Sequence, residues 1–257
     1  MLNNHKYIAF ETILVKEIRR FTRIWVQTLV PPAITIGLYF LIFGNLIGNR
    51  IGGMNGFAYM DFIVPGLIMM AVIQNSYANV VSSFFSQKFQ RSIEELIVSP
   101  VPNYIILAGF VAGGVARGIA VGVIVVLMSF AFTNLSIHSW GVTIFVVLMT
   151  AIVFSLAGFL NALFANSFDD ISIIPTFVLT PLIYLGGVFY SIDLLPEAGR
   201  ILSSFNPVFY MVNTFRYGIL GTSDANIYLS LGMLSLLVVV LFIACLVLLR
   251  KGTGLRH

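Results

Sequence analysis

Charged residues are scarce in this chain of 257 residues. Asp, Glu, Lys and Arg make up 9% of the sequence, whereas hydrophobic residues make up 59%. Soluble domains carry about 25% charged residues and seldom contain long apolar runs. This composition excludes a soluble globular domain and predicts a polytopic membrane protein.

The signatures of several chemistries are also missing. The chain has no GxxxxGK[ST] phosphate loop, no HExxH and no CxxC, and its histidines lie at the termini and in one loop: His5, His138 and His257. No TVGYG-like filter indicates a potassium channel, and no row of buried acids indicates a proton relay. We therefore expect no catalytic, metal or cofactor site, and an energy source on another chain.

Two features that could carry chemistry are better explained as structural. Cys245 is the single cysteine, so it has no disulfide partner and is expected to act as a small apolar residue. Asp169 and Asp170 are adjacent, but no histidine or third carboxylate lies nearby in the sequence. Helix capping therefore explains them better than acid/base or metal chemistry.

Long uncharged runs fill most of the chain, and a membrane-spanning helix needs about 20 apolar residues. This length predicts an all-α polytopic fold with six transmembrane helices: Ile24–Ile47, Phe62–Phe85, Ile105–Phe132, Trp140–Phe164, Ile171–Tyr190 and Ile227–Leu249. They form a single transmembrane domain over residues 1–257, with spans in residues 24–249 and a tail at residues 250–257. Pro31 and Pro32 predict a kink in the first span, whose freed carbonyl groups need other donors.

The positions of lysine and arginine predict the orientation in the membrane. With six spans, both termini lie on one side. Segments on that side hold Lys6, Lys16, Arg19, Arg20, Arg23, Lys88, Arg91, Arg250, Lys251 and Arg256, whereas the opposite side holds Arg50, Arg200 and Arg216. The positive-inside rule therefore places both termini in the cytoplasm. The net charge of +4 follows from this topology and gives no reason to expect nucleic acid.

Residues 1–23 have the pattern of an amphipathic helix. An apolar stripe recurs at helical spacing at Tyr7, Phe10, Leu14, Ile18 and Phe21, and cations lie opposite it at Lys16, Arg19, Arg20 and Arg23. Such a helix lies in the cytoplasmic membrane interface, with its cations among anionic lipid head groups. The pattern fits an anchor that sets the topology or a surface that binds a partner.

A charged segment, Gln87–Pro102, separates the second and third spans. As one helix, it would carry Phe85, Phe89, Ile93 and Leu96 on one face, and Arg91, Glu94 and Glu95 on the other. Pro100 and Pro102 would end this helix. The pattern fits a solvated cytoplasmic loop, the commoner case, or a short helix that docks a partner.

Polar residues in the spans predict contacts inside the bundle. Asn75, Asn79 and Ser82 share one face of the second span, where they would line a helix contact or a water-filled path. Arg117 in the third span costs at least about 2.5 kcal/mol at the bilayer centre unless it is paired, snorkels or faces water, and no acid within the spans is available to pair with it. Snorkelling and a functional role both remain open for it. Four glycines around it allow close helix approach: Gly109, Gly113, Gly114 and Gly118.

The segment after the fifth span is too polar to cross a membrane and too apolar for a free loop. Two short helices broken at Asn206-Pro207 and dipping back into the outer membrane region satisfy both constraints. We expect Asp193, Glu197 and Arg200 to face water.

Several stretches stand in a specific order along the chain: VPPAITIGLYFLIFGNLIG, YMDFIVPGLIMMAVIQNSYANVVSSFF, KFQRSIEELIVSPVP, PTFVLTPLIYLGGVFYSIDLLP and FNPVFYMVNTFRYGILG. Together they resemble an ABC-2 type permease, the membrane subunit of a bacterial ATP-binding cassette exporter, over essentially the whole chain. The resemblance implies six spans, an interface helix at the start and re-entrant external helices between spans five and six. It also implies a dimer of permeases beneath two copies of a separate ABC ATPase, which would bind ATP and Mg.

In such permeases the segment after the second span is the coupling helix that fits a cleft of the ATPase. The resemblance therefore assigns that role to Arg91, Ser92, Ile93, Glu94, Glu95 and Leu96, and makes a docking site a better interpretation than a solvated loop. The interface helix with Lys16, Arg19, Arg20 and Arg23 would lie beside it.

Family substrates include polysaccharides, lipid-linked glycans, drugs and antibiotics, so the expected function is outward movement of a hydrophobic, lipid-linked or glycan-type substrate or drug across the inner membrane. Candidate path residues are Tyr39, Phe43, Asn75, Asn79, Ser82, Arg117 and Tyr184. The aromatic residues, with Phe40, Phe189 and Tyr190, also fit a membrane-interface belt. A secondary transporter or channel without an ATPase is the alternative function, and a membrane enzyme is disfavoured because no nucleophile, base and orienting group converge.

Overall fold

The computed structural model describes residues 2–48, 53–54, 56–133 and 135–254. Arg50 and Arg256, and the last residues of the predicted tail at residues 250–257, lie outside this part of the chain. So does residue 1 of the predicted interface helix.

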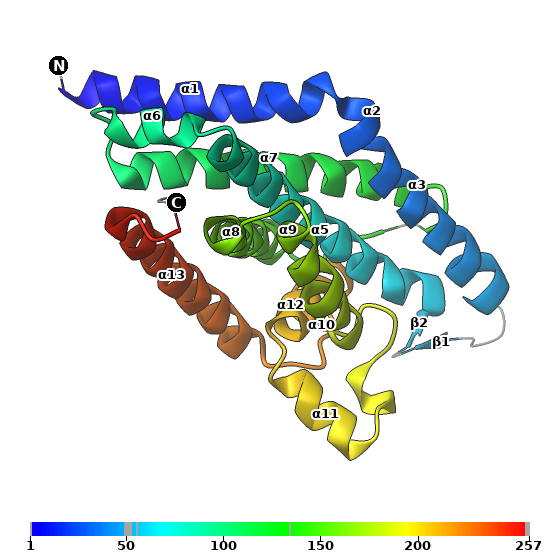
Figure 1. Cartoon of the computed structure of the whole chain (residues 1–257). Coiled ribbons are helices and arrows are strands. Elements are labelled where there is room, and N and C mark those ends of the chain that lie inside the picture. Colours follow the sequence, from blue (N-terminus) through cyan, green and yellow to red (C-terminus); the bar gives the residue numbers. More distant parts are fainter. Residues whose placement is uncertain (1, 49–52, 55, 134, 255–257) are drawn as a thin grey trace.

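Most described residues belong to helices (Figure 1). In chain order the helices are α1 (Leu2–Arg23), α2 (Trp25–Thr28), α3 (Val30–Tyr39), η1 (Phe40–Ile47), α5 (Tyr59–Phe89), α6 (Ser92–Val98), α7 (Asn103–Ser129), α8 (Trp140–Phe164), α9 (Asp170–Ile174), η2 (Pro175–Leu179), α10 (Thr180–Leu185), η3 (Ile192–Leu194), α11 (Glu197–Ser204), α12 (Pro207–Leu220) and α13 (Ile227–Lys251). Two short strands, β1 (Gly53–Met54) and β2 (Phe57–Ala58), pair antiparallel with Gly53 opposite Ala58.

Five of the predicted spans correspond to helices that are long and apolar enough to cross a membrane. These helices are Trp25–Gly44, Tyr59–Phe89, Asn103–Ser129, Trp140–Phe164 and Ile227–Lys251. The predicted fifth span, Ile171–Tyr190, is too long: the apolar helix formed by α9, η2 and α10 ends at Leu185. It ends there because Gly186 and Gly187 follow, and Gly187 has a φ of +75°, which breaks the helix.

Helix α5 forms the centre of the bundle and packs against α7, α8 and α12. Glycines on the neighbouring helices allow this packing, as predicted for α7. A Cβ atom added at Gly118 of α7 would overlap the Ser76 hydroxyl of α5, and one added at Gly158 of α8 would lie 2.6 Å from the Tyr77 carbonyl oxygen. The backbones therefore meet where a side chain would not fit.

Helix α1 lies across α7 at one end of the bundle (Figure 1). Its predicted apolar stripe is rotated from the buried face, because the side chains that face the protein are Ile13, Glu17 and Phe21, whereas Tyr7 is 66% exposed. Ile13 and Glu17 fit over Gly109 and Gly113 of α7, where a Cβ atom would overlap them. The glycines of α7 thus determine how closely α1 packs against it.

Replacing Gly113 by alanine is expected to lower the free energy of unfolding of the purified protein by about 1–3 kcal/mol, because the new methyl group overlaps the Glu17 side chain. A lower melting temperature would report this loss. The matched control is Gly232→Ala on α13, where an added Cβ atom would meet no neighbouring atom within 4 Å. That control should be neutral or stabilising, since alanine favours a helix by about 1 kcal/mol over glycine. Equal melting temperatures for the two variants would contradict the α1–α7 contact.

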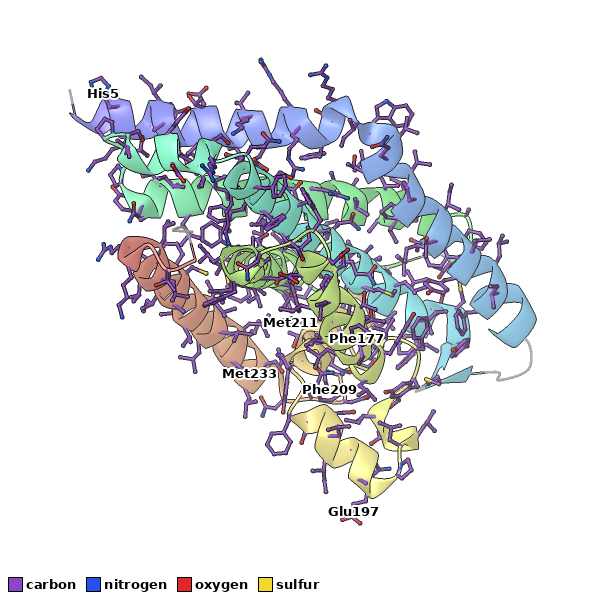
Figure 2. All side chains as sticks on the ribbon, viewed as in Figure 1. His5, Phe177, Glu197, Phe209, Met211 and Met233 are labelled. Carbon is purple, nitrogen blue, oxygen red and sulfur yellow. The ribbon has the colours of Figure 1, made fainter. Side chains whose placement is uncertain are left out.

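The two ends of the bundle differ in what they carry. Helices α1 and α6 and the C-terminal end of α13 lie at one end, and α11 and the β1–β2 pair lie at the other (Figure 1). Figure 2 shows His5 of α1 and Glu197 of α11 at opposite ends of the molecule. The predicted break at Asn206-Pro207 is confirmed, since the Asn206 side chain accepts a hydrogen bond from the Val208 amide and caps α12.

The predicted external charges separate into two kinds. Asp193, Glu197 and Arg200 are exposed, as expected. Arg216 was counted with them, but it is only 1% exposed, and its guanidinium group lies 3.9 Å from the centre of the Phe62 ring. The rule that orients spans by lysine and arginine counts treats every cation as a loop charge, and Arg216 instead sits inside the packing of α12 on α5.

Candidate functional site

The predicted docking segment Gln87–Pro102 is a bent element. Helix α5 ends at Phe89, and Arg91 takes a φ of 59°, so α6 starts in a new direction at Ser92. Arg91 is the only non-glycine residue with positive φ in the described ranges, and this conformation costs about 1–2 kcal/mol. The prediction of one helix with Phe89 and Ile93 on one face is therefore wrong: Phe89 is 62% exposed and Ile93 is 1% exposed.

Within α6 the predicted two faces are present. Ile93 is buried and Leu96 is partly buried, whereas Arg91, Glu94 and Glu95 are exposed. The helix ends at Val98, before Pro100 and Pro102, as the prolines predicted. Arg91 and Glu95 form no ion pair within 4 Å among the residues described. Their charges are thus available to a partner.

Lys88 fixes the junction between α5 and α6. The lysine and arginine count placed it in a cytoplasmic loop, but it is buried, and its Nζ donates hydrogen bonds to the carbonyl oxygens of Leu163 (2.8 Å) and Ala165 (2.7 Å). These carbonyls end α8, where a cation is favoured by the helix dipole. A force on α6 would therefore reach α8 as well as α5.

The link after α8 is closed by Ser167 and Asp170. The Asp170 carboxylate accepts hydrogen bonds from the amides of Asn166 and Ser167, and the Ser167 hydroxyl accepts one from the Asp170 amide. This reciprocal pattern is a capping box, so Asp170 has the structural role predicted for one of the two adjacent carboxylates.

A cleft of about 360 Å³ separates α6 from α1. Thr12, Ile13 and Lys16 line it from α1, and Ser92, Glu95, Leu96 and Ser99 line it from α6 and the link that follows. The predicted coupling residues and interface helix are thus neighbours around one recess, which carries charges of both signs.

The polar stripe of the second span faces α1. Arg20 donates hydrogen bonds to the Asn79 carbonyl oxygen (2.9 Å) and Oδ1 (2.8 Å), and to the Ser82 hydroxyl (3.4 Å). The predicted placement of Arg20 opposite the packed face is therefore wrong, whereas Lys16, Arg19 and Arg23 are exposed. Asn79 serves a helix contact.

Glu17 is an acid of this contact that the sequence patterns did not reveal. It is fully buried, accepts a hydrogen bond from the Ser83 hydroxyl (2.5 Å), and lies 3.4 Å from Arg20. Its place among cations on an amphipathic helix hid it, because charged positions are assigned to the polar face. Its partner Ser83 lies 66 residues away in the chain.

Arg117 has a structural task that follows from the prolines of the first span. Pro32 has no amide hydrogen, so the carbonyl of Thr28, four residues earlier, loses its helix partner. The Arg117 guanidinium donates to this oxygen at 3.2 Å and to Asn75 Oδ1 at 3.2 Å. The prediction that freed carbonyls need other donors is confirmed at Thr28. The prolines lie in the first turn of α3, so the bend falls before them.

The aromatic candidates gather elsewhere. Rings of Tyr39, Phe43, Tyr184 and Phe189 pack together, with centroid distances of 4.9 Å for Phe43–Phe189 and 5.7 Å for both Tyr39–Phe189 and Tyr184–Phe189. The Tyr39 and Tyr184 hydroxyls are 3.4 Å apart. Phe40 instead packs against Phe132 and is buried. The candidate path residues therefore form one aromatic and one polar group.

A further cleft, of about 390 Å³, lies between α5 and the short helix α9–η2–α10. Gln74, Tyr77 and Ser82 line it from α5, and Ser172, Thr176 and Thr180 line it from the short helix. Ser82 is the candidate path residue that borders this space. Hydroxyl, amide and apolar groups thus line the same cleft.

Comparison with known proteins decides the family. The ABC-2 type transporter model matches residues 8–220. The chain belongs to the ABC-2 type transporter family. The permease is 58% identical over 250 residues to the inner membrane transport permease YadH of Escherichia coli (strain K12), covering 97% of this chain and 98% of that protein. It is 24% identical over 218 residues to nodulation protein J of Rhizobium leguminosarum bv. viciae, covering 83% of each.

The permease is a multi-pass inner-membrane transport protein, as its apolar helices and its similarity to an inner membrane transport permease support. Membership of the family also implies a partner ATPase. The family resemblance found in the sequence motifs is confirmed.

Proposed function

We propose that the permease is the membrane subunit of an ATP-driven exporter in which α6 is the coupling helix. The observation that carries this proposal is a short helix with exposed Glu94 and Glu95, preceded by exposed Arg91, at the bundle end that holds α1. Two copies of a separate ATPase, each binding ATP and Mg, would dock on a pair of permeases. Both termini and α6 would then face the cytoplasm, and six crossings would include the short helix ending at Leu185.

Movement of the ATPase subunits would reach the bundle through α6. This helix follows α5 after the turn at Arg91, and Lys88 joins the same point to the end of α8. A tilt of α6 would therefore rotate α5 and α8 together and widen the cleft beside Ser82. The path could then open to each side of the membrane in turn without a catalytic residue in this chain.

For the transport path we propose the cleft between α5 and α9–η2–α10, followed by the aromatic group around Tyr39, Phe43 and Tyr184. Ser82 would contact the substrate, whereas Asn75, Asn79 and Arg117 would hold the helices that form the wall. α11 and α12 would be re-entrant helices beyond the exit. The cargo would be a hydrophobic, lipid-linked or glycan-type molecule or a drug.

Reversing both carboxylates of α6, in Glu94→Lys/Glu95→Lys, is expected to weaken capture of the ATPase by about tenfold or more, because complementary charges would become repulsive. The measurement is the amount of P-loop ATPase, identified by mass spectrometry, that co-purifies with tagged permease. The matched control, Asp193→Lys/Glu197→Lys, changes two exposed acids, of which Glu197 lies at the opposite end (Figure 2), and should capture wild-type amounts. Wild-type capture by the α6 variant, with an unchanged melting temperature, would rule out this docking site.

Purified permease in liposomes tests the alternative, a secondary transporter or channel. The proposal expects no substrate movement until the ATPase and ATP are added. Movement by the permease alone would replace the exporter with this alternative.

A further inference from the structure

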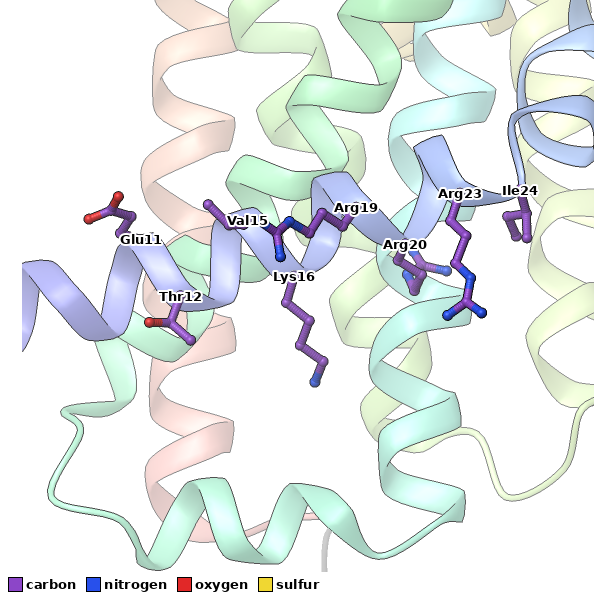
Figure 3. A pocket seen from close by; sticks show the side chains of 8 residues that line it. All are labelled: Glu11, Thr12, Val15, Lys16, Arg19, Arg20, Arg23 and Ile24. Carbon is purple, nitrogen blue, oxygen red and sulfur yellow. The ribbon is translucent and has the colours of Figure 1, made fainter.

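The cations of α1 surround a hollow of about 1010 Å³ on the surface of the helix (Figure 3). Lys16, Arg19, Arg20 and Arg23 line it, together with the single carboxylate of Glu11. Figure 3 shows Lys16 and Arg23 extending from the same side of α1, while Glu11 points away from them. The hollow therefore has an excess of positive charge.

Arg20 is held rigidly at this hollow. Its terminal nitrogens are fixed by Asn79, Ser82 and Glu17, so its guanidinium group is oriented before any ligand arrives. Its Nε is buried and has no hydrogen-bond partner in the described part of the chain. Because that nitrogen is closed to solvent, Arg20 contributes to the hollow a fixed positive charge, which attracts an oxyanion.

A second cation adds to this charge. Arg117 and Arg20 both bind side chains of α5, at Asn75 and Asn79, and the buried Nε of Arg117 also lacks a partner among the described residues. Within residues 2–48, 53–54, 56–133 and 135–254, Glu17 is the only acid within 4 Å of either guanidinium. Arg20 is thus paired with one carboxylate and Arg117 with none within this distance in the described residues, and an added anion would reduce the remaining positive charge.

The surroundings of the hollow are apolar on one side. Val15 and Ile24 line it, and the chain continues into the exposed side chains of Trp25 and Val26. Beyond them, Ile34, Leu38 and Leu41 are exposed along the first apolar helix. A positively charged recess next to an apolar helix face is complementary to an amphiphile with an anionic head group.

We propose that this hollow binds the phosphate group of an anionic lipid, with the hydrocarbon chains along the exposed face of α3. A bulk phospholipid and a lipid-linked substrate share this chemistry. An acidic protein loop would satisfy the cations but would leave the apolar face unused, so the lipid accounts for more of the surface. The inference goes beyond the exporter proposal, because binding requires neither ATP nor the ATPase.

Native mass spectrometry of the purified permease tests the site with three added probes: phosphatidylglycerol, a polyprenyl monophosphate and zwitterionic phosphatidylcholine. Lys16→Gln/Arg23→Gln is expected to bind phosphatidylglycerol about 30-fold more weakly, from the loss of two cations near the phosphate. Both residues are exposed, so the fold should persist. The control, Arg250→Gln/Lys251→Gln, removes two exposed cations at the end of α13 and should bind as wild type.

The outcomes separate the sources of the phosphate. Tighter binding of phosphatidylglycerol identifies a bulk membrane lipid, whereas tighter binding of polyprenyl monophosphate identifies a lipid-linked cargo, and either supports the site. Equal binding of phosphatidylcholine, or unchanged binding by Lys16→Gln/Arg23→Gln, overturns it. Loss of ATPase capture in this variant, with lipid binding intact, would assign the hollow to a protein partner. Lipid binding and ATPase capture are separate measurements, so the lipid site can fail while the docking site at Glu94 and Glu95 stands, and the reverse.

Discussion

Replacing Arg216 by methionine is expected to lower the free energy of unfolding by about 2–4 kcal/mol. Its guanidinium donates to the carbonyl oxygens of Gly187 (2.7 Å) and Phe62 (3.3 Å) and to Asn213 Oδ1 (3.0 Å). Methionine fills similar volume but leaves these buried acceptors without donors. It also removes the cation over the Phe62 ring. Removing a buried charge recovers part of its desolvation cost, which is why the expected loss is below the sum of the contacts.

The measurement is thermal unfolding in detergent, followed by the helical signal. Arg200→Met is the matched control, because Arg200 is exposed and bonds only to carbonyl groups of its own segment in the contacts described. Arg216→Lys should fall between the two, since an ammonium group cannot reach three acceptors in the same plane. Equal melting temperatures for Arg216→Met and Arg200→Met would contradict the buried contacts of Arg216. The lysine and arginine count, which treated Arg216 as an exposed loop charge, would then stand.

The main features of the fold follow from local patterns in the chain. Runs of about 20 apolar residues predicted six spans, and five of these correspond to long apolar helices. Prolines predicted the end of α6 and the break before α12, because a missing amide acts within a few residues. The predicted fifth span ran too far because apolarity continues through Gly186-Gly187, whereas the backbone turns there. Local composition could not show that turn.

The buried charges could not be predicted, because their partners come from distant parts of the sequence. Glu17 is satisfied by Ser83, Lys88 by the end of α8, and Arg216 by the turn at Gly187. Periodicity assigns each of these residues to a polar face. Arg117 is a partial exception. Pro32 indicates that the Thr28 carbonyl needs another donor, but the sequence does not show that Arg117 is that donor. The coupling role proposed for residues 91–96 rests on the resemblance of the whole segment.

Replacing Glu17 by leucine is expected to detach α1 from the bundle, at a cost of about 2–3 kcal/mol. The Glu17 carboxylate is the acid beside Arg20, and Ser83 and Asn79 donate to it from α5. Without it, the Ser83 hydroxyl is buried with no acceptor, and Arg20 keeps its charge beside Arg117. Because Arg20 is 30% exposed, water offsets part of this cost, so the expected loss lies below that for a fully buried pair.

Detachment would expose α1 without unfolding the spans, so the decisive measurement is the rate of tryptic cleavage after Arg19, Arg20 and Arg23. Glu17→Leu should be cut at least about tenfold faster than wild type, since each 1.4 kcal/mol raises the open population tenfold. Glu17→Gln keeps a hydrogen-bond acceptor for Ser83 and should be cut at an intermediate rate. Glu11→Leu changes an exposed acid of the same helix and should match wild type. Equal cleavage of the Glu17 and Glu11 variants would mean that apolar contacts at Ile13 and Phe21 hold α1 without the carboxylate.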